Sequence, residues 1–312
     1  MENRAFRVIL ARPRGFCAGV IRAIEIVERA LGEYGTPVFV LHEIVHNRHV
    51  VEKLKSRGAR FVESLGEMPS GAVMILSAHG VSTTVVQQAK QRNLRIIDAT
   101  CPLVTKVHLQ AQRYSQQGFE LIIIGHPGHP EVEGTRGWVE GPVHVIPNRS
   151  GIELLGIKNP NRLAYVTQTT LSTDDTRDVI AALKRRFPNV QGPNLSDICY
   201  ATQSRQNAVR LLAKVIDLLL VVGARNSSNS NRLREVGEQN SLSSHLIEDV
   251  NDLNPDWFVK VARVGITAGT SAPEWMVQSV LEKLRHFGAC EVAELESERE
   301  ETHFRLPKSL VQ

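Results

Sequence analysis

The sequence lacks the features that mark secreted, membrane and disulfide-rich proteins. Its 312 residues include four cysteines, and no two of these are close enough for a C-x-x-C pair. The longest apolar run, residues 218–222, is far shorter than the ~20 residues that a membrane helix needs. Residues 1–7 are polar and lack the apolar segment of a signal peptide, so we expect a cytoplasmic protein.

Charge of one sign is also missing. The 37 Lys and Arg residues and the 33 Asp and Glu residues are interspersed, and the formal net charge is +4. Because there is no basic block with aromatic residues among it, we expect no nucleic-acid binding. The slight positive balance fits an anionic small substrate or an acidic protein partner. With 42% hydrophobic residues, the chain has the composition of a globular protein large enough for two or three compact units.

What is present is a regular alternation of strand-like apolar runs and amphipathic helical patterns. Strands are expected at residues 6–11, 37–41, 73–77, 95–98, 121–125, 163–167, 218–223 and 264–267. Helices are expected at residues 20–31, 82–91, 102–116, 174–186, 202–216 and 272–284. A further short strand and an extended segment are expected from residue 290 onward. This alternation predicts an α/β fold with parallel sheets.

Three of the cysteines divide the chain. Cys17, Cys101 and Cys199 are roughly evenly spaced, and each precedes a helical pattern. We therefore predict three similar α/β units of about 100 residues, near the lower end of the usual domain size. Their expected bounds are 1–100, 101–197 and 198–312, the last with a C-terminal tail.

Polar residues gather directly after four of the expected strands. The stretches are Ala78-His79-Gly80, His126-Pro127-Gly128-His129-Pro130-Glu131, Ala224-Arg225-Asn226-Ser227-Ser228-Asn229 and Ala268-Gly269-Thr270-Ser271-Ala272-Pro273. Ligands of parallel α/β folds bind beyond the carboxyl ends of the strands, so we expect these loops to line one cavity. The last two stretches have the hydroxyls of an anion cradle at a helix start. Simple helix capping explains either stretch alone.

Three histidines in turn contexts, His46, His79 and His129, leave two interpretations open. Imidazoles can hold a catalytic zinc, or they can donate hydrogen bonds to a phosphate. Zinc is the weaker interpretation because no H-x-x-x-H helix is present. Glu131 can serve as a proton donor if its surroundings exclude water and raise its pKa. The stretch Thr167-Gln168-Thr169-Thr170 offers hydroxyls for a proton relay.

The widely spaced cysteines also leave alternatives open. Three thiolates are too few for a closed structural zinc site, which takes four ligands. A cubane iron–sulfur cluster is usually held by four cysteines, so three would leave one iron without a protein ligand. Spacing alone favours buried, inert thiols over a cluster.

The sequence closely resembles the LytB family of 4-hydroxy-3-methylbut-2-enyl diphosphate reductases, which act in the non-mevalonate isoprenoid pathway. The resemblance extends from about residue 8 to residue 307. It rests on specific stretches that follow one another along the chain: PRGFCAGV, HEIVHN, SAHGVS, DATCPLVTKVH, GHPGHPEVEGT, TQTTLS, DICYAT, NSSNSNRL and GITAGTSAP.

The resemblance implies a [4Fe–4S] cluster at the centre of three α/β units, with three cysteine ligands and one open iron. By motif match the ligands are Cys17, Cys101 and Cys199, whereas Cys290 matches no cluster motif. The implied catalytic residues are Glu131, which delivers a proton, and Thr169 near the substrate alcohol. The implied substrate-binding residues are His46, His79, His129, Gln168, Thr169, Ser227, Ser228, Asn229 and Ser271.

The implied reaction is a two-electron reductive dehydroxylation, the last step of that pathway. It converts 4-hydroxy-3-methylbut-2-enyl diphosphate to isopentenyl diphosphate and dimethylallyl diphosphate. A ferredoxin or a flavodoxin is the implied electron donor. Three other functions remain alternatives: a hydro-lyase with a three-cysteine cluster, an iron–sulfur sensor, and a zinc hydrolase that uses the three histidines.

Overall fold

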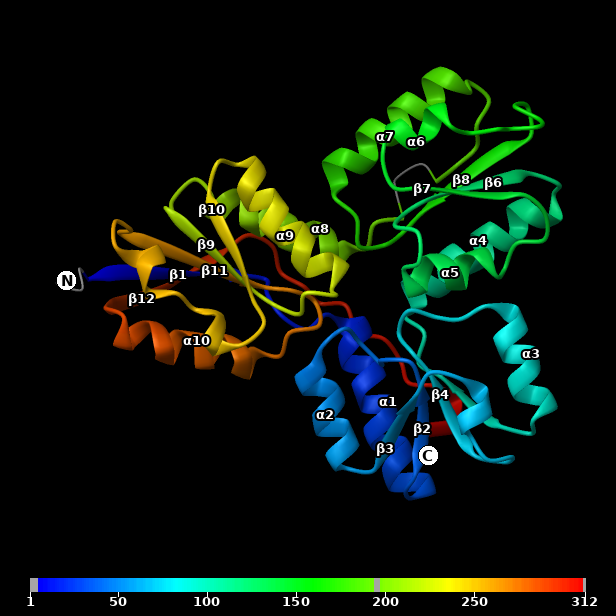
Figure 1. Cartoon of the computed structure of the whole chain (residues 1–312), viewed down its shortest axis with the longest axis horizontal. Helices are drawn as coiled ribbons and strands as arrows, with labels where there is room; N and C mark the ends of the chain where they lie inside the picture. The colour runs from blue at the N-terminus through cyan, green and yellow to red at the C-terminus, as the bar shows by residue number, and fades with distance from the viewer. Residues whose placement is uncertain (1–4, 194–196, 311–312) are drawn as a thin grey trace. The chain divides into compact units, whose positions relative to one another are not determined.

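The computed structural model describes residues 5–193 and 197–310 of the chain. These residues form an α/β fold with three separate parallel sheets, which confirms the predicted fold class (Figure 1). The chain divides into two compact units. The single-sheet unit comprises Met1–Ala18, His46–Val50 and Tyr200–His303, and the two-sheet unit comprises Gly19–Val45, Val51–Cys199 and Phe304–Gln312.

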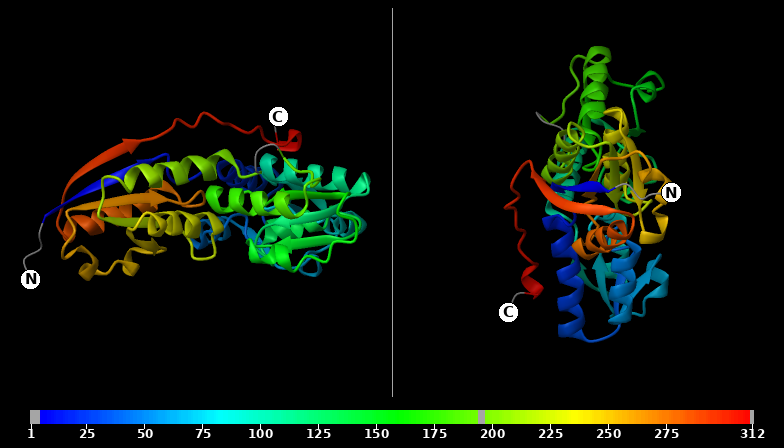
Figure 2. Two further views of the ribbon diagram at one scale, coloured as in Figure 1. Left: turned by 90° about the horizontal axis from the view of Figure 1, so that it is seen from above. Right: turned by 90° about the vertical axis from the view of Figure 1, so that its left-hand side faces the viewer.

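The single-sheet unit holds a five-stranded sheet in the order β10-β9-β11-β1-β12, with every neighbouring pair parallel. Its strands are β1 (Phe6–Arg12), β9 (Leu218–Val222), β10 (Ser243–Ile247), β11 (Arg263–Ala268) and β12 (Ala289–Glu296). Its long helices are α8 (Tyr200–Leu212), α9 (Ser228–Gln239) and α10 (Glu274–His286). Figure 2 shows β12 beside β1, followed by extended chain.

Helices cover both faces of this sheet. Along β9 the side chains alternate: Leu218 and Leu220 belong to the cluster with α10, whereas Leu219 and Val221 belong to the cluster with α8 and α9. Every residue of β9 is buried, as a strand between two helical layers requires. The continuous apolar run that predicted this strand therefore reflects burial on both faces.

The two-sheet unit holds a four-stranded sheet, β3-β2-β4-β5, and a three-stranded sheet, β7-β6-β8, both parallel. The strands are β2 (Val38–Leu41), β3 (Ala59–Val62), β4 (Val73–Leu76), β5 (Arg95–Asp98), β6 (Glu120–Ile124), β7 (Val143–Ile146) and β8 (Leu163–Thr167). The helices of this part of the chain are α1 (Ala18–Tyr34), α2 (Arg48–Ser56), α3 (Thr83–Gln91), α4 (Pro102–Gln116), α5 (Pro130–Arg136), α6 (Ser150–Glu153) and α7 (Thr173–Arg186).

All three sheets share one strand order. If strands are counted from the helix that follows each cysteine, the order is second-first-third-fourth in β3-β2-β4-β5. The single-sheet unit repeats it as β10-β9-β11-β1, with β1 in fourth place and β12 added beyond it. In the third sheet, β7-β6-β8 is extended by a parallel bridge between Ala164 and Gln191. The strand order reverses between the first and third strands, which is where α/β sheets bind ligands.

The eight expected strands and six expected helices are present, with ends shifted by a few residues at most of them. The strand expected after residue 290 is also present, as β12. The observed sheets differ from the expected first unit, 1–100, because β1 pairs with β11 and so lies in the sheet of the C-terminal region. The three-unit division of the chain stays a prediction. None of the helices in the described residues is long and apolar enough to span a membrane.

Candidate active site

The three predicted cluster cysteines lie in loops that occupy equivalent positions relative to the three sheets. Each one directly precedes the first residue of a helix: α1 after Cys17, α4 after Cys101 and α8 after Cys199. Each also donates its backbone N–H to a carbonyl two residues beyond the end of a third strand. The acceptors are Thr270 O for Cys17 at 3.2 Å, Ala78 O for Cys101 at 3.0 Å and Thr169 O for Cys199 at 3.0 Å.

This donor set fits an iron–sulfur cluster. All three cysteines are partly buried and outside any disulfide, and a helix N-terminus stabilises the negative charge of a thiolate ligand. The thiols are divided between the units, with Cys17 on the single-sheet unit and Cys101 and Cys199 on the two-sheet unit. Among residues 5–193 and 197–310, no group of three or more His, Cys, Asp or Glu side chains forms a metal site.

The predicted site residues follow the first and third strands of every sheet. After the first strands come His46, the pair His129 and Glu131, and the Ser227–Asn229 stretch. After the third strands come His79, the pair Gln168 and Thr169, and Ser271. In each sheet these two strands flank the reversal of strand order, so the predicted residues lie at the place where such sheets bind ligands.

In the single-sheet unit, hydroxyl and amide groups surround the start of α9. Ser227 is buried and caps the helix, because its Oγ accepts the backbone N–H of Ser230 at 3.3 Å. Asn229 is also buried, and its Oδ1 accepts the N–H of Thr270 at 3.0 Å. Since Thr270 O accepts the N–H of Cys17, the backbone of Thr270 joins the NSSN loop to the cysteine loop.

His46 and Ser271 meet in the same unit. The Ser271 hydroxyl donates to the backbone carbonyl of His46 at 2.9 Å. The next residue, Asn47, is buried and contacts the sulfur of Met276 in α10 at 3.6 Å. Together these contacts fix the backbone that carries the His46 imidazole. The helix expected from residue 272 begins at Glu274, and Pro273 is its N-cap.

In the two-sheet unit, Glu131 and Thr169 form a buried pair. Glu131 Oε1 accepts the N–H of Thr169 at 2.6 Å, and its Oε2 accepts the Thr169 hydroxyl at 2.9 Å. Burial raises the pKa of Glu131 to about 7, although both hydrogen bonds from Thr169 act in the opposite direction. The negative charge of Asp197 contributes further to the rise. The result is a carboxyl group that can hold a proton near neutral pH.

The remaining predicted residues of this unit lie around that pair. The rings of His79 and His129 meet edge to face with centroids 6.0 Å apart. His129 caps α5, since its Nδ1 accepts the N–H of Glu131 at 3.2 Å. Gln168 Oε1 accepts the N–H of His126 at 3.0 Å and so ties the loop after β6 to the loop after β8.

The sequence motifs did not reveal several supporting residues. Asp197 lies two residues before Cys199, and its buried carboxylate accepts the N–H of Thr167 at 3.1 Å. Burial raises the pKa of Asp197 to about 6. Thr270 acts through its backbone N–H and carbonyl, which leave no side-chain signal. The position of Asp197 in the DICYAT stretch was the one available indication for it.

Fold and site together define an α/β protein with three parallel sheets, polar loops at each reversal of strand order, and a thiol beside each sheet. The model of the LytB family, described as "LytB protein", matches residues 8–285. A protein of Burkholderia pseudomallei named 4-hydroxy-3-methylbut-2-enyl diphosphate reductase is 57% identical over 306 residues, which are 98% of each chain. A reductase of the same name from Zymomonas mobilis is 57% identical over 97% of this chain and 89% of its own.

A solved structure shares the whole fold. It is described as the E-1-hydroxy-2-methyl-but-2-enyl-4-diphosphate reductase from Plasmodium falciparum. It covers 99% of this chain and 98% of its own, with a TM-score of 0.95 and 36% sequence identity. The chain therefore belongs to the LytB family.

Proposed function

We propose that this chain reduces 4-hydroxy-3-methylbut-2-enyl diphosphate to isopentenyl diphosphate and dimethylallyl diphosphate. The reaction consumes two electrons and two protons, breaks the allylic C–O bond and releases water. The carrying observation is the 57% identity, over 98% of both chains, to a reductase named for this substrate. The chain is thus an oxidoreductase that performs the last step of the non-mevalonate pathway.

The LytB family is an iron–sulfur family, and Cys17, Cys101 and Cys199 hold the [4Fe–4S] cluster in this proposal. Their equivalent positions, each at a helix start and each with its N–H on a third-strand loop, support this assignment. With three protein ligands, one iron stays open. When bound, the cluster supplies single electrons and a Lewis-acidic metal.

Glu131 is the proton donor of the proposal. A carboxyl with a pKa of about 7 is partly protonated at the pH of the cytoplasm, whereas an exposed glutamate is fully ionised. Thr169 orients the group, because its backbone and its hydroxyl bind the two carboxylate oxygens. The Thr169 hydroxyl, which donates to Glu131, can also form a hydrogen bond with the alcohol of a bound substrate. Thr169 is therefore part of the proposed catalytic site. Gln168 fixes the neighbouring loop.

The diphosphate is bound by neutral and cationic donors. Hydroxyl, amide and helix-start N–H groups come from Ser227, Ser228, Asn229 and Ser271. These uncharged groups donate hydrogen bonds to an anion. His46, His79 and His129 add imidazole N–H donors. A ferredoxin or flavodoxin delivers the electrons, and the reaction takes place in the cytoplasm.

Turnover under strict anaerobiosis tests the proposal. Freshly reconstituted protein is mixed with a one-electron reductant and 4-hydroxy-3-methylbut-2-enyl diphosphate, and the two five-carbon diphosphates are quantified. We expect product that depends on the reductant. Product without reductant would point to a hydro-lyase, and no product from protein with a full cluster would point to a sensor. Bound zinc in a colourless protein would indicate a hydrolase.

A further inference from the structure

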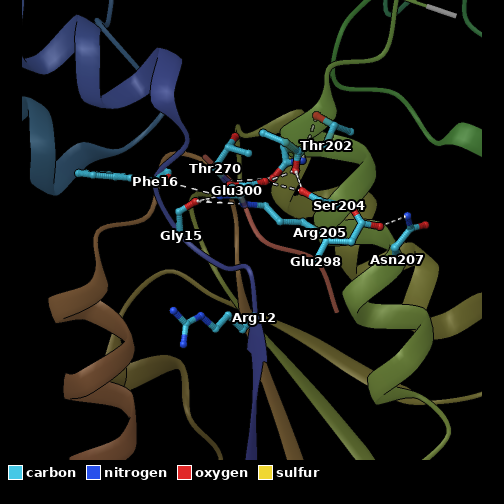
Figure 3. A network of polar contacts seen from close by, with 12 residues as sticks. Arg12, Gly15, Phe16, Thr202, Ser204, Arg205, Asn207, Thr270, Glu298 and Glu300 are labelled. Atoms are coloured by element: carbon cyan, nitrogen blue, oxygen red, sulfur yellow. Dashed lines mark hydrogen bonds and ion pairs between the residues drawn. The ribbon is translucent and has the colours of Figure 1, made fainter. Parts of the chain in front are cut away.

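A fully buried arginine holds the loop that carries Cys17. Arg205 lies in α8, and its exposed fraction is 0%. Its Nε and Nη2 donate to the carbonyl of Gly15 at 3.1 and 2.7 Å, and Nη2 also lies 3.3 Å from the carbonyl of Phe16. Figure 3 shows the side chain reaching from α8 to these two residues. They are the two residues immediately before the cysteine.

The Cys17 loop is tightly constrained at the same place. Gly15 has a φ of +69°, and a Cβ built there would lie 3.0 Å from the carbonyl oxygen of Ala272. Its N–H donates to Ala268 O at 3.0 Å, and the N–H of Cys17 donates to Thr270 O at 3.2 Å. The N–H groups of Gly15 and Cys17 are thus bound by residues at and after the end of β11. Arg205 supplies donors for the carbonyls of Gly15 and Phe16 in the same turn.

The charge of Arg205 is matched by the chain's C-terminal segment. Glu300 Oε1 accepts from Arg205 Nη1 at 2.7 Å and from the Ser204 hydroxyl at 2.5 Å. Two residues earlier, Glu298 accepts from Asn207 at 2.8 Å. Glu298 and Glu300, two residues apart in the extended segment, thus contact successive turns of α8. This is possible because two residues of extended chain are about as long as one helical turn. A buried guanidinium needs such a partner, since an uncompensated buried charge is strongly destabilising.

A second arginine repeats this arrangement in the two-sheet unit. Arg22 lies in α1, and its Nη1 donates to the carbonyl of Thr100 at 3.0 Å. Thr100 immediately precedes Cys101. Arg22 Nη2 lies 3.3 Å from the carbonyl of Asp98, at the end of β5. In both sheets the arginine belongs to the helix that leads into the first strand, and it binds the loop between the fourth strand and the cysteine.

We propose that Arg205 and Arg22 are positioning residues for the cluster, each fixing the backbone that presents one cysteine ligand. The inference rests on the proposed function, in which these thiols hold the cluster. Arg205, with Glu300, sets the direction of the Cys17 thiol, and Arg22 sets that of Cys101. Residues that orient metal ligands in this way typically change metal affinity or activity by about 10- to 100-fold when they are replaced.

Reciprocal substitution tests the proposal. Arg205→Met and Arg22→Met are compared with Arg29→Met, an arginine of α1 that is about half exposed and pairs with Glu25. The rate at which a chelator removes iron from the reconstituted protein is expected to rise roughly tenfold in the first two variants and to stay unchanged in the third. Arg205→Lys and Arg22→Lys are expected to retain more iron than the methionine variants, because one donor group remains.

Amide exchange of the metal-free protein separates positioning from general loss of structure. Arg205→Met is expected to speed exchange in a peptide spanning residues 13–18 and not in one spanning 98–103, and Arg22→Met to do the opposite. Exchange that rises equally in both peptides, or iron retention like that of the unchanged chain, would overturn the proposal. Should Arg205→Met not fold, Glu300→Gln with Glu298→Gln as its control gives the same comparison. An unchanged chain that takes up no iron and sulfide would refute the proposed function, while the exchange data would still decide the positioning roles.

Discussion

The loops of the single-sheet unit and those of the β7-β6-β8 sheet have the same framework and different chemistry. In the first, Asn229 Oδ1 accepts the N–H of Thr270 at 3.0 Å, and in the second, Glu131 Oε1 accepts the N–H of Thr169 at 2.6 Å. Both threonines lie two residues beyond a third strand, and both offer their carbonyl to a cysteine N–H. An amide and a carboxyl group thus hold equivalent places.

The difference suits the two loops to the different tasks that the proposed function gives them. An amide is neutral at every pH of interest, so it can hold a loop beside an anion without repelling it. A carboxyl group in the same place gains a titratable proton, and burial moves the pKa of Glu131 to about 7. In the proposed function, one framework would therefore serve anion binding in one sheet and proton transfer in another, through a single change of side chain.

Removing the carboxyl group has the largest expected effect. Glu131→Gln makes the β7-β6-β8 sheet resemble the single-sheet unit, because glutamine keeps an oxygen for the Thr169 N–H and loses the transferable proton. We expect turnover to fall roughly 100- to 10,000-fold while iron and sulfide content stay normal. Anaerobic turnover and metal analysis measure the two quantities. Glu133→Gln, an exposed glutamate of the same helix, is the matched control, and near-normal turnover of Glu131→Gln would remove Glu131 from the proton path.

The same group makes stability depend on pH. The pKa of Glu131 is raised in the folded state to about 7, above the ordinary value of 4.5, so the folded protein binds the proton more tightly. The stabilisation is complete below pH 4.5 and is lost as the pH rises to about 7. Relative to Glu131→Gln, the metal-free protein should lose about 3 kcal/mol of unfolding free energy over this range. Denaturant unfolding at several pH values measures it, and parallel pH profiles of the two proteins would contradict the raised pKa.

The reverse change places a carboxyl group at position 229, in the loop of the single-sheet unit. Asn229→Asp keeps an acceptor for the Thr270 N–H and adds a negative charge beside the proposed diphosphate site. We expect the KM for the diphosphate substrate to rise about tenfold, with a smaller change in kcat, because the repulsion acts mainly on binding. Steady-state kinetics measure both. Gln239→Glu adds the same charge at the exposed C-terminal end of α9, and an equal rise in KM there would show that the effect is not specific to residue 229.

The fold was predictable where buried residues form a recognisable apolar pattern within one stretch of sequence. Strands between two helical layers, such as β9 (Leu218–Val222), are continuous apolar runs and were predicted. The overlooked strands β3, β7 and β10 all lie at sheet edges, where fewer side chains are buried. The pairing of β1 with β11 joins residues more than 250 positions apart, so no local pattern could show it.

The residues of the proposed site could be picked out from the sequence for a similar reason. Polar residues in turns, such as His129 and Ser227, stand out from the apolar strands before them. Arg205 does not, because a buried arginine inside an amphipathic helix has the sequence appearance of a solvated one. Its role depends on the carbonyls of Gly15 and Phe16, and backbone acceptors leave no trace in a sequence.

The smallest expected effect belongs to the fourth thiol. Cys290 is exposed in β12, and its Sγ donates to the carbonyl of Phe6 at 3.3 Å. A serine hydroxyl can make the same hydrogen bond, so Cys290→Ser should change the unfolding free energy by less than about 0.5 kcal/mol. Iron and sulfide content should also stay at the level of the unchanged protein.

Cys290 serves as the control for the other three thiols. Cys17→Ser, Cys101→Ser and Cys199→Ser should each lower cluster content, because each removes one of the three proposed ligands at a helix start. Cys290 follows no third-strand loop and precedes no helix, so position rather than thiol chemistry is what separates it from the others. Metal analysis of the four variants therefore tests whether the shared backbone position defines a ligand. Iron loss in Cys290→Ser, or full iron in any of the other three, would break that rule.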